Sequence, residues 1–339
     1  MKYLTAGDSH GKCLVGIIEG IPYGIDINEK YINEQMRRRR ECMGRSKRQN
    51  IEDDRFDIIS GLHNGITTGM PVGVILYNKS TREINDSSVF TPSYGDLYGM
   101  IKYSSFNSSV IKERTSARET AARVLLLSFA KRFLELLGIT ITSDVISCYD
   151  SKNKKDFSRI IKKFEEEGDS FGGVFEIRVE NLIPCLGGFM EGYDRLESKL
   201  SEIIFTIGSI KAVEFGDGIN IALKKSSDII KNPDLLGGIE AGMTTGGPIL
   251  IRATTRPLAG IRKKVESYNL KTKKKVFISN TTSDITSVFA AAVISEYLVS
   301  FVIADEIIKK FGSDNFYDIK KQYELWKRKT KKTLKGIKK

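Results

Sequence analysis

The chain contains few of the residues that metal sites and disulfide frameworks need. Its 339 residues include four cysteines and two histidines. The cysteines are far apart and form no CxxC pair, so we expect structural thiols and neither a zinc site nor disulfides. His10 and His63 alone cannot build a histidine-rich metal site. We therefore predict no metal. The cysteines are Cys13, Cys42, Cys148 and Cys185.

Long hydrophobic runs are also scarce. Residues 1–12 contain no apolar stretch of the signal-peptide kind, so we expect no secretory leader. The longest apolar segment, 288–304, is interrupted by Ser295, Glu296 and Ser300. It is short for a membrane span and suits a buried helix better. These features predict a cytoplasmic protein with no membrane partner.

The net charge of +12 is concentrated in two places. Residues 320–339 contain ten lysines and arginines against one acidic residue, Glu324. We interpret this segment as a solvated basic tail that follows a single domain over 1–319. The tail carries no nucleic-acid-binding motif, and its aromatics are limited to Tyr323 and Trp326, so we expect no nucleic-acid partner.

The second basic cluster lies within the body of the chain. Residues 27–36 are predicted to be helical, and the arginine run 37–40 follows them, with Arg45, Lys47 and Arg48 close behind. Guanidinium groups bind phosphates and carboxylates in a bidentate manner. The cluster therefore indicates an anion site, for the phosphate of either a small molecule or a nucleic acid.

The two halves of the chain repeat one another. The sequence GDSHG at 7–11 returns as GDSFG at 168–172, and GITTGMP at 65–71 returns as GMTTGGP at 242–248. Each half, about 1–140 and 165–312, therefore has the same order of elements, which predicts a pseudo-two-fold domain with a ligand site where the halves meet. After each motif comes a strand-like run, and each half ends in an apolar segment that is predicted to be helical. The strand-like runs are 14–18, 174–179, 72–77 and 249–253, and the predicted helices are 116–137 and 284–311.

His10 has Phe171 as its counterpart in the repeat. A turn that itself required a histidine would be expected to keep a polar residue in both copies. A lone histidine can simply be a satisfied turn or core residue, which is the structural alternative. Its position between Ser9 and Gly11, in a tight loop with room for a ligand, favours a chemical role.

The start of the helix predicted at 116–137 is suited to binding an anion. Ser116 and Glu119 have the spacing of a capping box, and Gly138 provides a stop. Free backbone amides at a helix start attract phosphate. The alternative is an ordinary cap whose arginines pair with surface carboxylates. The polar side chains gathered here are Arg114, Thr115, Ser116 and Arg118.

Taken together, these motifs resemble the chorismate synthase family. The resemblance covers about residues 4–311, with the motifs in the family's order. The residues that carry it lie at 7–11, 38–40 with 44–46, 101–103 with 113–120, 214–218, 237–239 with Gly246, and the segment at Asp284.

The resemblance implies a fold and a reaction. The fold is α+β, a β-α-β sandwich in which central helices lie between antiparallel sheets, and it assembles as a homotetramer. The reaction is that of a lyase in the shikimate pathway of aromatic amino acid biosynthesis. Phosphate and a C6 proton leave 5-enolpyruvylshikimate 3-phosphate in a 1,4-anti elimination that gives chorismate. It requires reduced FMN, and NADPH is the source of reducing equivalents in those members that reduce their own flavin.

The resemblance also implies roles for individual residues. His10 acts as the acid at the leaving phosphate, and Asp284 acts with flavin N5 in proton removal. The substrate-binding arginines are Arg39, Arg45 and Arg118. The flavin contacts are Arg114, Thr115, Ser116, Gly208, Ser209, Ala241, Arg256, Pro257, Leu258, Ala259, Gly260 and Thr282.

This chain departs from the family pattern at several positions. Tyr94 stands in place of a second catalytic histidine, and Thr282 in place of a flavin-binding arginine; Leu258 replaces a threonine. Asn107 and Ser109 stand where the family has an aspartate and an arginine. Loss of one general acid costs about 10²–10⁴ in rate. The alternative to a working enzyme is therefore a relative that binds flavin or a phosphorylated ligand without turnover.

Overall fold

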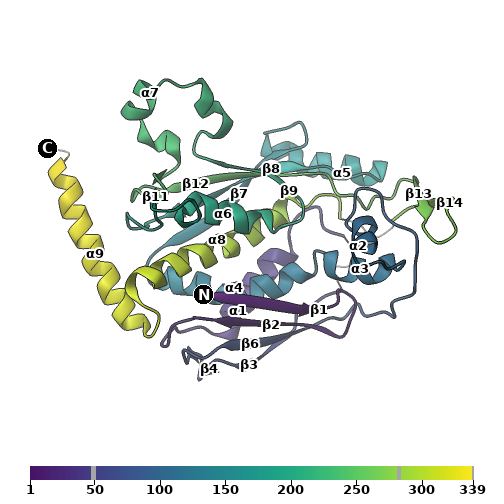
Figure 1. Ribbon diagram of the computed structural model, residues 1–339, viewed down its shortest axis with the longest axis horizontal. Helices are drawn as coiled ribbons and strands as arrows, with labels where there is room; N and C mark the ends of the chain where they lie inside the picture. The colour runs from purple at the N-terminus through teal and green to yellow at the C-terminus, as the bar shows by residue number, and fades with distance from the viewer. Residues whose placement is uncertain (47–50, 281–283, 338–339) are drawn as a thin grey trace.

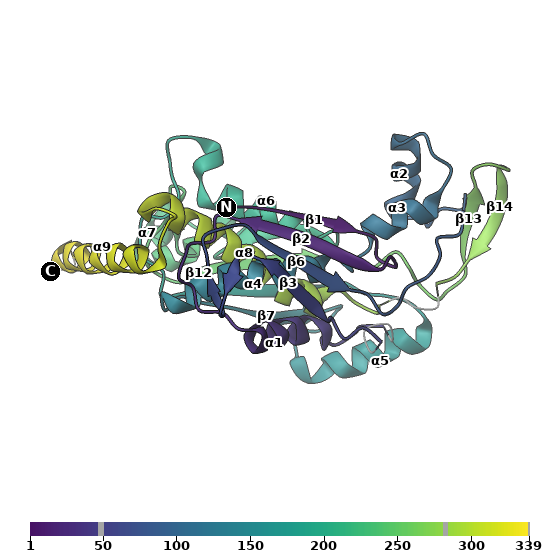
Figure 2. The same cartoon turned by 90° about the horizontal axis from the view of Figure 1, so that it is seen from below.

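Two four-stranded sheets enclose a pair of central helices in the computed structural model, which describes residues 1–46, 51–280 and 284–337 (Figures 1 and 2). Every neighbouring strand pair is antiparallel in both sheets. The first sheet has the order β1 (Lys2–Gly7), β2 (Cys13–Glu19), β6 (Val72–Tyr77) and β3 (Phe56–Ser60). The second has the order β7 (Thr140–Cys148), β8 (Gly173–Glu180), β12 (Ile249–Thr255) and β9 (Ile210–Phe215).

The internal duplication is confirmed by these strand orders. In each sheet the strands that come first and second along the chain are followed by the fourth and then by the third. The first strand of the second sheet, β7, lies before residue 165, where the second half was expected to begin. The predicted strand at 72–77 coincides with β6, and that at 249–253 lies within β12. Phe171, the counterpart of His10, is 1% exposed in the core. The repeated turn therefore forms with either an apolar or a polar side chain at this position.

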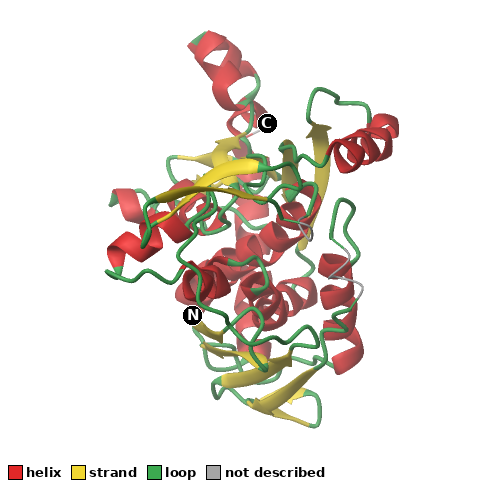
Figure 3. Cartoon of the chain, turned by 90° about the vertical axis from the view of Figure 1, so that its right-hand side faces the viewer, coloured by secondary structure: helices red, strands yellow, loops and turns green. Residues whose placement is uncertain are grey.

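The central helices are α4 (Glu119–Leu136) and α8 (Val288–Phe311), and both begin later than predicted. Ser116 has an extended backbone at the end of α3 (Ser108–Thr115), so the next helix cannot include it. Close packing of α4 on the first sheet depends on Gly16 of β2, where a Cβ would lie 2.6 Å from Leu126 Cδ1. Figure 3 shows the helices between the strands of the two sheets.

The buried serine hydroxyls of α8 have hydrogen-bond partners within the helix. The hydroxyls of Ser295 and Ser300 donate to the carbonyls of Ala291 and Glu296, four residues earlier in each case. α8 is long and apolar enough to cross a membrane by length and composition, but 78% of its most apolar window is buried inside the molecule. The prediction of a buried helix at 288–304 is therefore confirmed.

Helix α1 (Glu29–Arg40) extends four residues beyond the predicted helical segment. Asn28 caps its N-terminus, because the Asn28 side chain accepts a hydrogen bond from the amide of Tyr31. Its last turn consists of the arginine run 37–40, and basic residues there interact favourably with the negative end of the helix dipole. The arginines are thus part of the helix rather than of the loop after it.

A buried charge network joins the two halves. Glu296 of α8 accepts two hydrogen bonds of 2.8 Å from Arg38 of α1 and one of 2.7 Å from Ser143 of β7. It also pairs with Lys131 of α4, whose ammonium lies 4.9 Å from the ring centre of Tyr297. The network therefore connects α8 of the second half to α1 and α4 of the first.

Much of the basic tail is helical. Helix α9 (Phe316–Ile337) spans the predicted boundary at 319–320 and buries Phe316, Ile319 and Tyr323 against the body. The first turns of the predicted solvated tail therefore belong to the folded domain. From residue 327 to residue 336 its residues are exposed, apart from a partly buried Thr330, and the helix projects away from the sandwich (Figure 1).

Shorter elements complete the chain. The helices are α2 (Asp96–Lys102), α5 (Phe157–Glu167), α6 (Leu196–Phe205) and α7 (Ser226–Lys231), with short 3₁₀ turns at 154–156, 192–194, 218–223 and 233–236. The short strands pair as hairpins: β4 (Leu62–His63) with β5 (Ile66–Thr67), β10 (Ile239–Glu240) with β11 (Met243–Thr244), and β13 (Val265–Asn269) with β14 (Lys274–Ile278).

Candidate functional site

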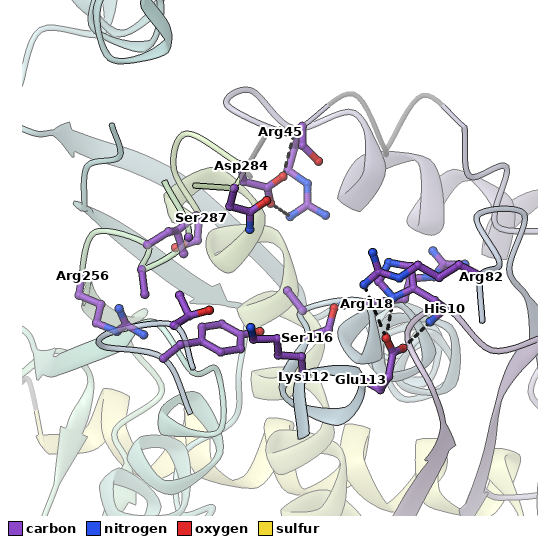
Figure 4. A pocket seen from close by; sticks show the side chains of 18 residues that line it. His10, Arg45, Arg82, Lys112, Glu113, Ser116, Arg118, Arg256, Asp284 and Ser287 are labelled. Atoms are coloured by element: carbon purple, nitrogen blue, oxygen red, sulfur yellow. Dashed lines mark hydrogen bonds and ion pairs between the residues drawn. The ribbon is translucent and has the colours of Figure 1, made fainter. Parts of the chain in front are cut away.

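A cavity of about 460 Å³ lies where the two halves meet, as the duplication predicted (Figure 4). The first half contributes the loop after β1, the segment after α1 and the junction of α3 with α4. The second half contributes the loop after β12 and the segment before α8. The predicted site residues that line the cavity are His10, Arg45, Ser116, Arg118, Arg256, Leu258, Ala259, Gly260 and Asp284.

His10 is held at the cavity by Glu113 of α3. One carboxylate oxygen of Glu113 accepts the backbone N–H of His10 at 2.7 Å, and the other lies 2.9 Å from its ring Nδ1. The preceding residue, Ser9, shares a 2.9 Å hydrogen bond with Ser116. The β1–β2 loop is therefore tied to the α3–α4 junction at two successive residues.

Arg118 is buried and already charge-matched. Its guanidinium pairs with Asp54, lies 3.4 Å from a carboxylate oxygen of Glu52, and donates to Asn78 Oδ1 at 2.8 Å and the Tyr77 carbonyl at 3.2 Å. Such a complete set of acceptors keeps a buried guanidinium rigid. The group therefore presents a fixed edge to the cavity.

Arg45 and Asp284 form an ion pair across the junction of the halves. Arg45 Nη1 lies 3.0 Å from one carboxylate oxygen of Asp284, and the other oxygen accepts the Ser46 amide at 2.7 Å. The Arg45 side chain is 7% exposed, and its Nε has no hydrogen-bond partner in the described part of the chain. A predicted substrate-binding residue and a predicted catalytic residue are thus in direct contact.

Comparisons with known proteins show the family to which this chain belongs. A family model described as "Chorismate synthase" matches residues 1–308. The chain belongs to the chorismate synthase family. It is 37% identical to the chorismate synthase of Caldanaerobacter subterraneus subsp. tengcongensis, covering 96% of this chain and 98% of that protein. It is 32% identical to that of Streptococcus uberis, with coverages of 98% and 100%.

The fold agrees with this membership. A solved structure described as "Crystal Structure of Chorismate Synthase" matches with a TM-score of 0.77 at 29% identity, covering 96% of this chain and 97% of that one. The expected α+β sandwich, with central helices between antiparallel sheets, is confirmed. The resemblance inferred from the motifs is likewise confirmed.

Arg39 does not reach the cavity surface. It is fully buried, with its Nε and Nη2 donating to Thr120 Oγ1 and its Nη2 also to the Ala117 carbonyl. Its Nη1 lacks a partner among the described residues. Burial, together with the positive charges of Arg45 and Arg118, lowers the pKa of Arg39 to about 9. Arg39 therefore lies behind the cavity wall, against the start of α4.

The predicted capping box is wrong. Ser116 accepts a hydrogen bond from the amide of Arg118 at 3.3 Å, not from that of Glu119. The Glu119 carboxylate instead accepts bonds of 2.8 Å from Thr5 Oγ1 and Arg123 Nε. The reason is the extended turn between α3 and α4, which places Ser116 before the helix rather than at its N-cap.

Of the flavin contacts predicted in and after α3, only Ser116 lines the cavity. Arg114 turns toward β1, where it donates to the carbonyl and the hydroxyl of Thr5. The Thr115 hydroxyl donates to the Ile111 carbonyl within α3. Both residues are exposed, and neither lines the cavity.

The loop after β12 forms the opposite wall. Arg256, Leu258, Ala259 and Gly260 line the cavity, and Pro257 supplies a carbonyl that accepts from Arg256 Nη1. The predicted turn Gly208–Ser209 lies directly beneath this loop, because the Arg256 amide donates to the Ser209 carbonyl at 2.8 Å. The Ser209 hydroxyl is buried and has no partner in the described structure.

One predicted flavin contact, Ala241, is not brought to the cavity. Ala241 lies in the β10–β11 turn at φ 49°, shortly before β12, whereas the cavity lies beyond the other end of that strand. β12 has seven residues, so about 20 Å separate its ends. Thr282 lies outside the described residues.

Tyr94, which stands in place of the family's second histidine, does line the cavity. Its hydroxyl donates to the Thr115 carbonyl at 3.2 Å. Burial raises the pKa of Tyr94 above its ordinary value of 10. The side chain is therefore neutral at physiological pH and releases its proton less readily than an exposed tyrosine.

Several lining residues were missed by the sequence analysis. Glu113 was quoted as part of a motif but given no role, and nothing in the spacing showed that it contacts His10. Arg82 and Lys112 bring further positive charge, the latter held 3.1 Å from the buried Asp96. Asn280 and Ser287 also line the cavity. Only the contact between remote segments reveals these residues.

Proposed function

We propose that this protein is a working chorismate synthase. It catalyses the 1,4-anti elimination of phosphate from 5-enolpyruvylshikimate 3-phosphate to give chorismate, and it requires reduced FMN. The observation that carries the proposal is the meeting of His10 and Asp284, from different halves, in one arginine-rich cavity. A phosphorylated substrate with two carboxylates is a polyanion, and guanidinium groups suit it.

The lining residues fit a flavin mononucleotide as well as the substrate. Arg45 Nε and the Ser287 hydroxyl are buried polar groups without partners in the described structure, and each could serve an acceptor on a ligand. Leu258 and Ala259 offer an apolar surface to a planar ring. A volume of about 460 Å³ falls in the usual range for small-molecule sites. Among the described residues, no cluster of His, Cys, Asp and Glu could hold a metal ion.

In the proposed reaction, the residues of this chain have separate roles. Bound reduced FMN supplies electron density that helps to expel the phosphate. His10 gives a proton to the departing phosphate oxygen as the C–O bond breaks and its electron pair leaves with that oxygen. Asp284, held at the wall by Arg45 and the Ser46 amide, takes part in removal of the C6 proton. The buried guanidinium groups orient the anionic substrate.

Phosphate release under anaerobic conditions tests the proposal. The assay supplies chemically reduced FMN, so it does not depend on whether this member reduces its own flavin with NADPH. We expect His10→Ala to lower kcat by about 100-fold or more with KM nearly unchanged, because a general acid acts in the transition state. The matched control is His63→Ala, an exposed histidine in β4. Absence of phosphate release by the folded wild-type protein would refute the proposal.

A second candidate function is binding of flavin or a phosphorylated ligand without turnover. The observation that favours it is Tyr94, whose raised pKa makes it a poor proton donor. Titration of oxidised and reduced FMN, with and without substrate, separates the two candidates. Flavin binding with no phosphate release supports the second candidate, whereas release of phosphate supports the first.

We further propose that the protein forms a homotetramer in the cytoplasm. The outer face of the first sheet supports self-association, since a row of apolar residues crosses all four strands: Leu4, Ile17, Gly73 and Ile59. Leu4, Ile17 and Ile59 are 72%, 54% and 64% exposed. An apolar face of this kind is typical of a surface that another subunit covers.

A further inference from the structure

The Glu113 carboxylate makes a two-point contact with His10 that includes the ring. Its Oε2 accepts the backbone N–H at 2.7 Å, and its Oε1 lies 2.9 Å from the ring Nδ1. The Glu113 residue is 4% exposed. One interaction therefore positions the loop and the other the imidazole.

We propose that Glu113 is a positioning residue that orients the His10 imidazole and stabilises its protonated form, and that Arg82 moderates this effect. The inference rests on the proposed function to the extent that His10 acts as the acid. The electrostatic part concerns the chain alone and needs neither flavin nor substrate.

The chemistry of a carboxylate beside an imidazole supports the assignment. When Nδ1–H donates to Glu113, Nε2 is the nitrogen through which the ring exchanges a proton with the cavity. An ionised carboxylate within hydrogen-bond distance favours imidazolium over neutral imidazole. A general acid must hold its proton until the leaving group needs it, so this contact prepares His10 for the role.

Other charges around His10 come from each neighbouring element. Arg82, in the loop after β6, has its Nη2 3.8 Å from the same Glu113 oxygen that faces the ring, and its amide donates to the His10 carbonyl. Arg118, at the start of α4, lines the same cavity, but Asp54 and Glu52 match its charge. On the loop of His10 itself, Asp8 and Lys12 are exposed and opposite in charge. Among the described residues, Glu113 and Arg82 are thus the charged pair that bears most directly on the ring.

A purely structural role for Glu113 makes a different prediction. If the carboxylate only anchored the loop through the backbone N–H, its charge would have no effect on the imidazole. The neutral variant Glu113→Gln keeps a carbonyl oxygen for the backbone N–H and removes the charge. It therefore separates the two roles.

The experiment is an NMR titration of the imidazole groups, which this chain makes simple because His10 and His63 are its only histidines. We expect Glu113→Gln to lower the pKa of His10 by about one unit or more. We expect Arg82→Gln to raise it by a smaller amount, because Arg82 is well exposed and screened by solvent. His63 serves as the internal reference and should titrate identically in every variant.

Glu83→Gln is the matched control, since Glu83 is exposed in the same loop as Arg82. It should leave the pKa of His10 unchanged. An unchanged His10 pKa in folded Glu113→Gln, or a fall in Arg82→Gln, would overturn the proposal. Should Glu113→Gln fail to fold, the ¹⁵N shifts of neutral His10 in the wild type decide the question: a proton on Nδ1 supports the pairing, and a proton on Nε2 alone contradicts it.

Kinetics then separate this inference from the proposed function. In the active enzyme, Glu113→Gln should lower kcat by about 10-fold or more and change KM little, with the acidic group of the pH–rate profile shifted to lower pH. If the pKa of His10 shifts in Glu113→Gln but the wild-type protein never releases phosphate, the pairing stands and the proposed function is refuted. Full activity with an unaltered pH profile in Glu113→Gln refutes the pairing and leaves the function intact.

Discussion

The positively charged side chains of the cavity differ in how many carboxylate partners the protein provides for them. Among the described residues, Arg118 pairs with Glu52 and Asp54, Arg45 pairs with Asp284, and Lys112 pairs with Asp96. A charge that is already matched costs less to bury and keeps a fixed position. The cavity is therefore preorganised, and a polyanionic ligand adds contacts to groups that need little rearrangement.

Tyr94 is the residue at which the activity should be easiest to improve. Replacing it with histidine introduces a group with an ordinary pKa near 6.5, which can donate a proton at neutral pH where Tyr94 cannot. We expect Tyr94→His to raise kcat by about 10-fold or more in the anaerobic phosphate-release assay. Tyr98→His is the control, because Tyr98 is 73% exposed on α2 and does not line the cavity. An equal response of the two variants would contradict a donor role at position 94.

At the scale of elements, α4 and α8 position the site because each begins at the cavity. The α3–α4 junction carries Ser116 and Arg118, and the segment before α8 carries Asp284 and Ser287. Glu296 fixes the relation between the helices by pairing with Lys131 on α4 and Arg38 on α1. Burial acts to raise the pKa of Glu296, but Arg38 and Lys131 outweigh it and hold the pKa below its ordinary value of 4.5.

Breaking this network should destabilise the whole fold. Glu296→Gln leaves Arg38 and Lys131 without their carboxylate, and we expect a loss of about 3 kcal/mol or more in the free energy of unfolding at pH 7, measured with urea. A carboxyl whose pKa is depressed by folding stabilises the protein above its unfolded pKa, and that stability is lost as the pH falls through the folded pKa. The difference between wild type and variant should therefore shrink below about pH 4.5.

The exposed Glu166 of α5 offers a matched control for that measurement. Glu166→Gln should change the free energy of unfolding by about 0.5 kcal/mol or less at any pH. A difference between wild type and Glu296→Gln that stays constant down to pH 3 would contradict the assigned role of the buried carboxylate.

At the scale of the whole molecule, two sheets related by duplication enclose the central helices. The first sheet presents Leu4, Ile17 and Ile59 outward, while the basic end of α9 projects from the body (Figure 1). The two surfaces differ in character, since the sheet face carries a row of exposed apolar side chains and the end of α9 carries mostly lysines and arginines. Subunit association is therefore expected through the sheet.

Charge introduced on the sheet face should disrupt assembly. Ile17→Lys places an ammonium in the centre of the apolar row, and burying it against another subunit would be costly. We expect light scattering after size exclusion to show a smaller assembly than for the wild type. Leu325→Lys on α9 is the control, because Leu325 is exposed to a similar extent, 52% against 54%. Identical masses for both variants and the wild type would contradict the proposed interface.

The order and spacing of motifs were enough to predict the duplication, the strands at 72–77 and 249–253, the buried helix and the family. Such features depend on neighbouring residues, whose hydrophobic period and turn chemistry are local properties. The predicted helix starts at 116 and 284 were wrong. An extended turn precedes α4 and a loop precedes α8, and local sequence patterns do not distinguish these segments from helix.

Folding alone decided which of the candidate residues meet. Glu113 lies against His10, Glu52 and Asp54 neutralise Arg118, and Arg39 is hidden behind the wall, although none of these relations follows from the spacing along the chain. The physical reason is that burial and charge pairing depend on distances between segments that are remote in the sequence. Those distances are set by how the two sheets pack on the central helices.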